Sequence, residues 1–355
     1  MKDFNFPLYN SKRGGDKFAL NDPVEREKYF KLKVGAEIEK IRDYLQNNSF
    51  VGFLLGKKNS GKGTYSKLFS EAVGPERIAH ISVGDIVRDA SQAIKDEALK
   101  KELLNHLEKN YRGFMPLEEA LNALLGRSTS NLLPTELILT LVEREILKVR
   151  GKALFIDGFP RNLDQVSYSL YFRHLMGYRD DPDFFVFIDV PEAIIDERMK
   201  YRVVCPVCRT PRNLKVLRTK EIGYSESKKE FFLICDNQSC GKSRMVPKEG
   251  DELGIEAIRD RIEIDNAVMK TLLGLNGVPK ILLRNSVPAD SARETVDDYE
   301  ITPAYRYEWD NQGKKVRVIE EPWAVRDEEG VLVNSLLPEA VVVSLISQVA
   351  KTLSS

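Results

Sequence analysis

The sequence feature that most constrains the fold is a turn rich in glycine and lysine at residues 56–64, which reads GKKNSGKGT. It follows an apolar run at residues 50–55 and precedes a stretch with a helical pattern. The turn fits G-x-x-x-x-G-K, in which backbone N–H groups and the positive end of the next helix surround a phosphate. Lys62 adds a point charge, and the hydroxyl residue of the pattern stands one position late, at Thr64. We therefore expect a phosphate-binding loop rather than a glycine-rich surface turn.

Further apolar runs follow this turn, at residues 78–83, 153–156, 184–190 and 281–283. Segments of helical length lie between them, for example at residues 134–149. Strands that alternate with helices predict a parallel sheet with helices on both faces. The sequence therefore indicates an α/β protein.

Composition places the chain among ordinary globular proteins. It has 355 residues, and 54 basic against 54 acidic residues give a formal net charge of +0. Zero net charge argues against a protein that mainly binds nucleic acid. No apolar run reaches the roughly 18 residues that a membrane helix needs, and the polar start lacks the apolar core of a secretion signal. We expect a cytoplasmic protein with no membrane partner, in which residues 1–22 form a loose polar segment.

The four cysteines form two closely spaced pairs in a lysine-rich stretch at residues 203–250. Cys205 and Cys208 make one pair, and Cys235 and Cys240 make the other. Four thiolates at such spacing satisfy a tetrahedral structural Zn²⁺. A chance cluster, or disulfides in an oxidising compartment, is the alternative. We expect zinc, which would hold together a small lobe that cannot build its own core.

Two further motifs follow predicted strands. The stretch HISVGDIVRDA carries Ser82, Asp85 and Arg88, which alone would indicate only a helix N-terminus with capping side chains. The stretch LFIDGFPRNLDQ places Asp157 at the end of an apolar strand, where a carboxylate can anchor Mg²⁺ and its waters.

The second stretch continues with residues that suit a nucleotide. Gly158 permits a close approach of the backbone, and Arg161 can hold a phosphate through two parallel hydrogen bonds. The side-chain amide of Gln165 offers both a donor and an acceptor, which suits the edge of a base.

Together these motifs resemble an adenylate kinase, in the nucleoside monophosphate kinase branch of P-loop proteins. The matching stretches are, in the family's order, GKKNSGKGT, ISVGDIVR, LLPTELILTLVEREI, FIDGFPRNLDQ, FIDVPEAIIDERMKYR and IEAIRDRI. The resemblance implies a three-layer P-loop core with a parallel sheet, a helical lobe that binds the monophosphate, and a β-rich lid resembling a zinc ribbon.

The resemblance also implies how the chain is divided. The core would span residues 48–300 and would include the monophosphate lobe at residues 82–135 and the zinc-binding lid at residues 203–250. Residues 1–47 would be an N-terminal extension with a helix. Residues 301–355 would be a C-terminal extension, with a β-hairpin turning at Asn311-Gln312-Gly313 and a last helix.

Each motif residue then has an implied role. ATP would be bound by the turn and by one arginine beside the adenine: Gly56, Ser60, Gly61, Lys62, Gly63, Thr64 and Arg198. AMP would be bound by Ser82, Arg88, Gly158, Arg161 and Gln165, with Arg259 as a further substrate-binding residue. Catalysis would depend on Lys62, Arg161, Arg202, Arg261 and Asp157, while Asp85 and Asp157 would order the waters around Mg²⁺.

The implied activity is reversible, Mg²⁺-dependent transfer of a phosphoryl group from ATP to AMP, giving two ADP, by in-line transfer under a closing lid. A kinase for UMP, CMP or GMP is the near alternative, although Gln165 favours adenine. A non-catalytic protein that binds nucleotides or RNA is the alternative from another class. We expect nucleotides as the partners and a monomer as the assembly, with a dimer through the terminal extensions left open.

Two departures from the family leave questions. The family has an arginine before the acidic run that precedes IEAIRDRI, and here either Arg244 or Lys248 could take that place. The stretch SNLLPTEL, at residues 130–137, also lacks the glycine expected before its Leu-Leu-Pro. The sequence does not choose between the two basic residues.

Overall fold

The computed structural model describes residues 6–7, 9–126, 133–172, 176 and 182–354. Its centre is a parallel sheet of five strands in the order β10-β4-β1-β3-β2. The strands are β1 (Val51–Gly56), β2 (Ile78–Ser82), β3 (Ala153–Asp157), β4 (Asp183–Asp189) and β10 (Lys280–Arg284). Each strand coincides with a predicted apolar run, so the predicted α/β sheet is confirmed.

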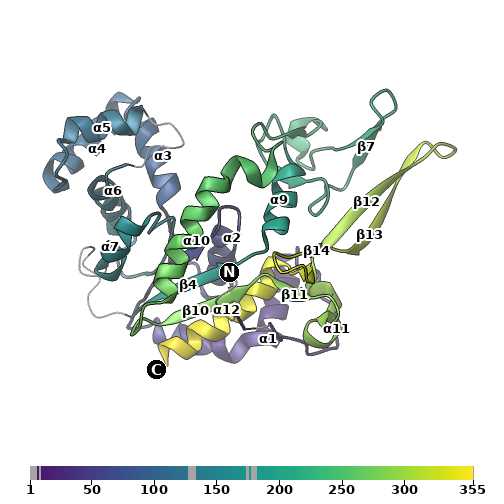
Figure 1. Ribbon diagram of the computed structural model, residues 1–355, viewed down its shortest axis with the longest axis horizontal. Coiled ribbons are helices and arrows are strands. Elements are labelled where there is room, and N and C mark those ends of the chain that lie inside the picture. Colours follow the sequence, from purple (N-terminus) through teal and green to yellow (C-terminus); the bar gives the residue numbers. More distant parts are fainter. Residues whose placement is uncertain (1–5, 8, 127–132, 173–175, 177–181, 355) are drawn as a thin grey trace.

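Helices cover both faces of this sheet and make three layers (Figure 1). On one face lie α1 (Pro23–Tyr44), α2 (Lys62–Val73) and α12 (Pro338–Leu353), and on the other lie α6 (Thr135–Leu147) and α10 (Arg259–Leu273). Side chains at residues 50–55 alternate between the layers: Phe50 and Leu54 pack with the first group, and Phe53 and Leu55 with the second. Of the helices described, none has an apolar stretch long enough to cross a bilayer.

A group of helices packs beside α6 at one end of the molecule (Figure 1). It consists of α3 (Val83–Ala93), α4 (Glu97–Asn110) and α5 (Leu117–Leu125). This is where the monophosphate lobe is predicted. Residues 127–132, which include the start of the stretch that lacks the expected glycine, lie outside the described residues. Shorter helices are α7 (Val166–Leu170), α9 (Glu192–Lys200), α11 (Ala292–Thr295) and the 3₁₀ turns Leu163–Gln165, Gln238–Cys240, Gly254–Ile258 and Asp298–Glu300.

The remaining strands form small antiparallel sheets outside the central parallel sheet. The cysteine region contains β5 (Arg202–Val204) between β6 (Pro211–Asn213) and β9 (Val246–Pro247), and a pair formed by β7 (Ile222–Ser225) and β8 (Glu230–Leu233). Near the C-terminus, β12 (Pro303–Asp310) and β13 (Lys315–Pro322) form the predicted hairpin, and β15 (Leu332–Ser335) lies between β11 (Ser286–Pro288) and β14 (Ala324–Arg326).

The C-terminal hairpin packs against the cysteine region, as the positions of β12, β13 and β7 in Figure 1 show. The ring of Trp309 stacks on Tyr224 with centroids 4.7 Å apart, and Tyr307 lies 5.6 Å from Phe231. The hydroxyl of Tyr307 also donates to the carbonyl of Leu214 at 2.6 Å. Because an isolated two-stranded hairpin is marginally stable, each hairpin needs this aromatic contact to bury an apolar face.

The described part of residues 1–22 is fixed on the protein, so the expectation of a loose segment is wrong. Tyr9 and Leu20 are buried, and the hydroxyl of Ser11 donates to the carboxylate of Glu300 at 2.8 Å. The sequence around these residues gives no regular pattern. Their partners lie near the other end of the chain, where local patterning cannot reveal them.

A buried ion cluster joins α1 to the segment before the C-terminal hairpin. The ammonium of Lys33 lies 2.7 Å from Asp297 Oδ2 and 3.1 Å from Glu300 Oε1, and the Lys33 side chain is 1% exposed. The hydroxyl of Tyr29 donates to Glu300 at 2.5 Å. Burial opposes ionisation of Asp297, but the contact with Lys33 and the backbone N–H groups of Arg13 and Gly14 together outweigh it and lower the pKa of that carboxyl. Lys33 therefore neutralises two carboxylates that the fold has removed from water.

We predict that Lys33→Met strongly destabilises the protein, because it leaves Asp297 and Glu300 buried without a cation. The free energy of unfolding should fall by about 3–5 kcal/mol in denaturant titrations. The matched control is Lys31→Met, an exposed position on the same helix, which should change it by less than about 0.5 kcal/mol. Equal stability of the two variants would contradict the cluster's role.

Candidate functional site

The glycine- and lysine-rich turn lies where β1 ends and α2 begins. Gly61 has φ of +98°, a backbone conformation that favours glycine. A side chain at Gly56 would place its Cβ 2.7 Å from Ser60 Oγ and 3.1 Å from the carbonyl oxygen of Ile188, so only glycine fits there. Lys62 curls back, and its ammonium donates to the carbonyls of Gly56 at 2.8 Å and Lys57 at 3.1 Å.

The donors of this turn suit an anion. Among the described residues, no side chain caps the start of α2, so none accepts the first N–H groups of this helix; those of Thr64 and Tyr65 donate to the carbonyl of Gly61. The buried hydroxyl of Ser60 also has no hydrogen-bond partner within the described structure. Thr64, directly beyond Gly63, is exposed on the first turn of α2. A helix N-terminus without a side-chain cap, a free hydroxyl and a lysine together offer the donors that a phosphate needs.

Asp157 lies beside this turn because of the sheet register. It ends β3, opposite Leu54 of β1 and Ser82 of β2. Its Oδ1 is 3.9 Å from the ammonium of Lys62. A carboxylate next to a phosphate-binding lysine can hold a hydrated divalent cation at the same place.

Ser82 caps helix α3, which confirms the structural interpretation of that motif. Its hydroxyl accepts the N–H of Asp85 at 3.3 Å. Asp85 in turn forms an ion pair with Arg88, and both side chains are more than half exposed. These three residues lie at or just beyond the end of β2, and none of the described contacts joins them to the turn at residues 56–64.

Arg161 and Arg261 are brought together from distant parts of the chain. Arg261 donates to the carbonyl of Arg161 at 3.2 Å, and its guanidinium pairs with Asp265 at 2.7 Å. Asp265 also accepts the backbone N–H of Lys58, in the turn, at 3.2 Å. Burial raises the pKa of Asp265, while Arg261 and Lys62 oppose that shift.

Asp265 is a residue that the sequence analysis missed. It is buried, and it ties helix α10 to the phosphate-binding turn while orienting the Arg261 side chain. The available signal was its position four residues after Arg261 on one helix, where opposite charges face each other. That signal alone does not distinguish it from a solvated surface pair.

The structure separates the two basic residues between which the sequence could not choose. Burial, and next the charge of Lys248, lower the pKa of Lys58 in the turn. Arg244 instead forms an ion pair with Glu230 and lies 4.1 Å over the ring of Phe232. Arg202 is near Lys58 as well and is held by both carboxylate oxygens of Asp251, at 2.5 and 2.8 Å.

Arg198 lies at the rim of the turn. It donates to the carbonyl of Asn59 at 3.5 Å and to Asn285 Oδ1 at 3.3 Å, and its guanidinium carbon is 5.8 Å from the ring centroid of Trp323. Burial lowers the pKa of this arginine, with Tyr65 opposing the shift. Asn285 and Trp323 were not predicted, because neither belongs to a motif.

Gln165 and Arg259 are both engaged within the protein. Gln165 is fully buried; its oxygen accepts the N–H of Arg161 at 2.8 Å, and its nitrogen donates to Thr135 at 3.2 Å. Gly158, with φ of +84°, lies against Val83 at the start of α3. Arg259 pairs with Glu192 at 2.8 Å and Glu256 at 2.5 Å, which raises its pKa.

The four cysteines form one cluster. Their Sγ atoms all lie within 4.8 Å of one another, and Cys205, Cys235 and Cys240 are buried. The backbone N–H of Cys208 favours the thiolate of Cys205 and lowers its pKa. Thr210, whose Oγ1 is 3.2 Å from Cys208 Sγ, lowers the pKa of Cys208 to about 6. Four converging sulfurs, two of them favoured as thiolates, can hold a soft divalent metal.

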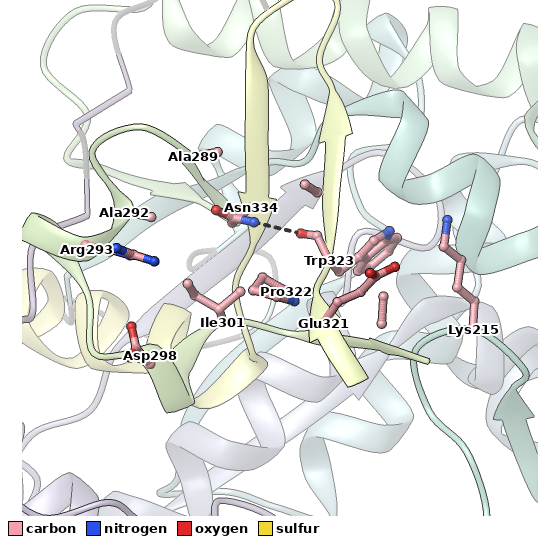
Figure 2. A pocket seen from close by; sticks show the side chains of 12 residues that line it. Lys215, Ala289, Ala292, Arg293, Asp298, Ile301, Glu321, Pro322, Trp323 and Asn334 are labelled. Atoms are coloured by element: carbon pink, nitrogen blue, oxygen red, sulfur yellow. Dashed lines mark hydrogen bonds between the residues drawn. The ribbon is translucent and has the colours of Figure 1, made fainter. Parts of the chain in front are cut away.

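A separate cavity of about 760 Å³ opens in the C-terminal part of the protein (Figure 2). Its wall includes Trp323 and Asn334, whose amide donates to the carbonyl of Trp323 at 3.3 Å. Charged side chains of both signs surround it: Lys215, Arg293, Asp298 and Glu321. None of the residues that line the cavity belongs to the glycine- and lysine-rich turn, and Trp323 in its wall lies next to Arg198.

Comparisons with known proteins point to one family. No protein-family model matches the chain. An adenylate kinase of Clostridium novyi is 31% identical over 212 residues, covering 59% of this chain and 79% of that protein. Adenylate kinases of Thermotoga neapolitana and Clostridium acetobutylicum are each 29% identical, over 231 and 242 residues, covering 65% and 64% of this chain and 86% and 93% of theirs.

Proposed function

Because this chain belongs to the adenylate kinase family, we propose that it transfers a phosphoryl group reversibly from ATP to AMP, giving two ADP. The observation that carries the proposal is the convergence on one sheet edge of the turn with Lys62, the carboxylate of Asp157, and the linked pair Arg161 and Arg261. A protein that only binds a nucleotide has no need of cations arranged around two phosphate positions.

The reaction needs no covalent intermediate on the enzyme. A phosphate oxygen of AMP bonds to the γ-phosphorus of ATP, while the bond from that phosphorus to the β–γ bridging oxygen breaks. Lys62 would follow the transferred group, and Arg161 and Arg261 would neutralise the acceptor and transferred phosphates. Asp265 keeps Arg261 directed at the site through its ion pair. Positioning and electrostatic stabilisation supply the rate.

A magnesium ion fits the donor set of this site. Asp157 would hold its waters at the end of β3, with Asp85 as the second carboxylate. The ion would neutralise charge on the phosphates when bound. Arg198 would contact the adenine of ATP, and Arg202, at the root of the lid, would reach the phosphates as the lid closes.

We propose Gln165 as the residue that reads the acceptor base, beside Ser82, Arg88 and Gly158. Its two bonds inside the protein leave one N–H and one lone pair of the amide unused. An adenine edge needs one donor and one acceptor. Guanine, cytosine and uracil present such a pair as well. The preference for AMP therefore rests on the similarity to adenylate kinases.

We predict that ADP forms from ATP with AMP much faster than with GMP, UMP or CMP. A mismatched base leaves polar groups of the site unpaired, so the other acceptors should react at least about tenfold more slowly. A coupled assay of ADP formation with each acceptor measures this. A pyrimidine monophosphate as the best acceptor would overturn the role of Gln165 and leave a monophosphate kinase.

The same assay tests the catalytic machinery through Lys62→Met. The turnover of this variant should be lower by about 10³-fold or more, because the lost Lys62 ammonium would stabilise the transferred phosphoryl group. Lys67→Met, on the exposed side of the same helix, is the matched control and should retain it. Unchanged turnover in Lys62→Met, with the fold intact by circular dichroism, would exclude the proposed mechanism.

We also infer that the cysteine cluster holds one structural Zn²⁺, which fixes the proposed lid at residues 203–250. The four sulfurs are held mainly by short loops, and few apolar side chains pack around them. A lobe with so small a core depends on a metal for its fold.

Purified protein should contain about one equivalent of zinc by elemental analysis. Chelation should lower the melting temperature and speed hydrogen exchange within residues 203–250, while the parallel sheet keeps its protection. Cys240→Ser should lose the metal, and Ser239→Ala, its neighbour outside the cluster, should retain it. A zinc content below about half an equivalent would contradict the assignment.

We further propose that Lys248, and not Arg244, is the basic residue of the lid that meets the triphosphate. Lys248 lowers the pKa of Lys58 in the turn, and its backbone N–H donates to the carbonyl of Arg202 at 3.3 Å. Arg244 is held by Glu230 and Phe232.

Lys248→Met should therefore raise the KM for ATP by about three- to tenfold, because one phosphate contact is lost. Arg244→Met should leave the KM for ATP within about twofold of the wild-type value. Steady-state kinetics at saturating AMP compare the two variants. The reverse ranking would assign the contact to Arg244.

A further inference from the structure

The C-terminal extension meets the phosphate-binding turn directly through Glu328. This residue follows β14, and one oxygen of its carboxylate, Oε1, accepts two hydrogen bonds. The ammonium of Lys57, the second residue of the turn, donates to it at 3.3 Å. The backbone N–H of Glu192, the first residue of α9, donates to it at 2.6 Å.

Lys57 is a buried charge that depends on these partners. Its side chain is 4% exposed, and its ammonium also contacts the carbonyl of Val190 at 3.2 Å and the carboxylate of Glu192 at 3.5 Å. A buried ammonium is costly unless carboxylates and carbonyls surround it. The carboxylate of Glu192 also pairs with Arg259. The carboxylate of Glu328, in contrast, pairs with no cation other than Lys57 in the described contacts.

The position of Lys57 determines where the phosphate-binding groups lie. The carbonyl oxygen of Lys57 accepts the ammonium of Lys62 at 3.1 Å and the backbone N–H of Ser60 at 3.1 Å. A shift of the Lys57 backbone would therefore move the lysine and the hydroxyl that face the phosphates. Glu328 thus holds the side chain of Lys57, and the main-chain carbonyl of Lys57 holds Lys62 and Ser60 in place.

Glu328 also stabilises the start of helix α9. No side chain of α9's own N-terminal residues caps this helix among the described contacts, and Glu328 supplies the missing acceptor from 136 residues away. A carboxylate at a helix N-terminus is favourable for both its hydrogen bond and the helix dipole. Helix α9 carries Arg198 and Glu197, and the carboxylate of Glu197 accepts the indole N–H of Trp323 at 2.6 Å.

We propose that Glu328 is a positioning residue for the ATP half of the site. It holds the phosphate-binding turn and helix α9 at a fixed separation, so that Lys62 and Arg198 meet one nucleoside triphosphate together. Burial opposes ionisation of Glu328, but the charge of Lys57 and the hydrogen bonds from Lys57 and from backbone N–H groups together outweigh it and lower the pKa of that carboxyl. The inference rests on the proposed function, because it names the triphosphate as the ligand.

The test compares Glu328→Gln with Glu329→Gln, its exposed neighbour. The glutamine at residue 328 can still accept the N–H of Glu192 but no longer neutralises Lys57. We expect kcat/KM for ATP to fall about three- to tenfold in Glu328→Gln, with the KM for AMP unchanged. The control should match the wild type. The melting temperature does not distinguish the two roles, because Lys57 loses a buried partner in either case. A merely structural residue would impair the kinetics of both nucleotides.

A double-variant cycle tests whether Glu328 affects ATP binding through Lys57. If Glu328 acts through Lys57, the variant Lys57→Met/Glu328→Gln should lose no more kcat/KM for ATP than Lys57→Met alone. Additive losses would overturn the route through Lys57.

Direct binding separates this inference from the proposed function. If wild-type protein forms no ADP, the proposed function fails, yet titration calorimetry with ATP still reports on Glu328. We expect Glu328→Gln to weaken ATP binding by the same factor as it lowers kcat/KM. Equal dissociation constants for ATP in the wild type and in Glu328→Gln would overturn the positioning role.

Discussion

The structure depends on the close approach of the backbone where β1 turns into α2. At Gly56 the chain runs so near Ser60 and Ile188 that a single added carbon would collide with both. This compact turn points the start of α2, and the ammonium of Lys62, at the same edge of the sheet where Asp157 ends β3. Every other element of the site is placed relative to that edge, because parallel strands present their carboxyl ends together.

Charged residues around the turn are paired within the protein, some along one helix and some between elements far apart in the sequence. Asp265 links Arg261 to the turn, Asp251 holds Arg202, and Glu328 holds Lys57. Each pair fixes the direction of an arginine or lysine side chain in the structure without a ligand. Such preorganisation reduces the reorganisation that binding and transfer would otherwise need.

The terminal segments are integrated with the site and do not merely extend the chain. Lys33 joins α1 to the segment before the C-terminal hairpin, and that hairpin packs its rings on the cysteine region. Trp323 and Glu328 then reach helix α9 and the turn. The cysteine region, which we propose as the lid, is therefore in contact with the C-terminal extension.

The sequence by itself determined the strands, the phosphate-binding turn, the cysteine pairs and the C-terminal hairpin, because each follows from neighbours in the chain: apolar runs, glycines at fixed spacing, paired thiols and an Asn-Gln-Gly turn. The tertiary structure alone decided which charges meet. Lys57 and Glu328 are 271 residues apart, and Lys33 and Asp297 are 264 apart. Arg244 is paired with Glu230, 14 residues earlier, which the sequence pattern did not indicate. Pairings across such distances carry no local periodicity, so only the folded chain reveals them.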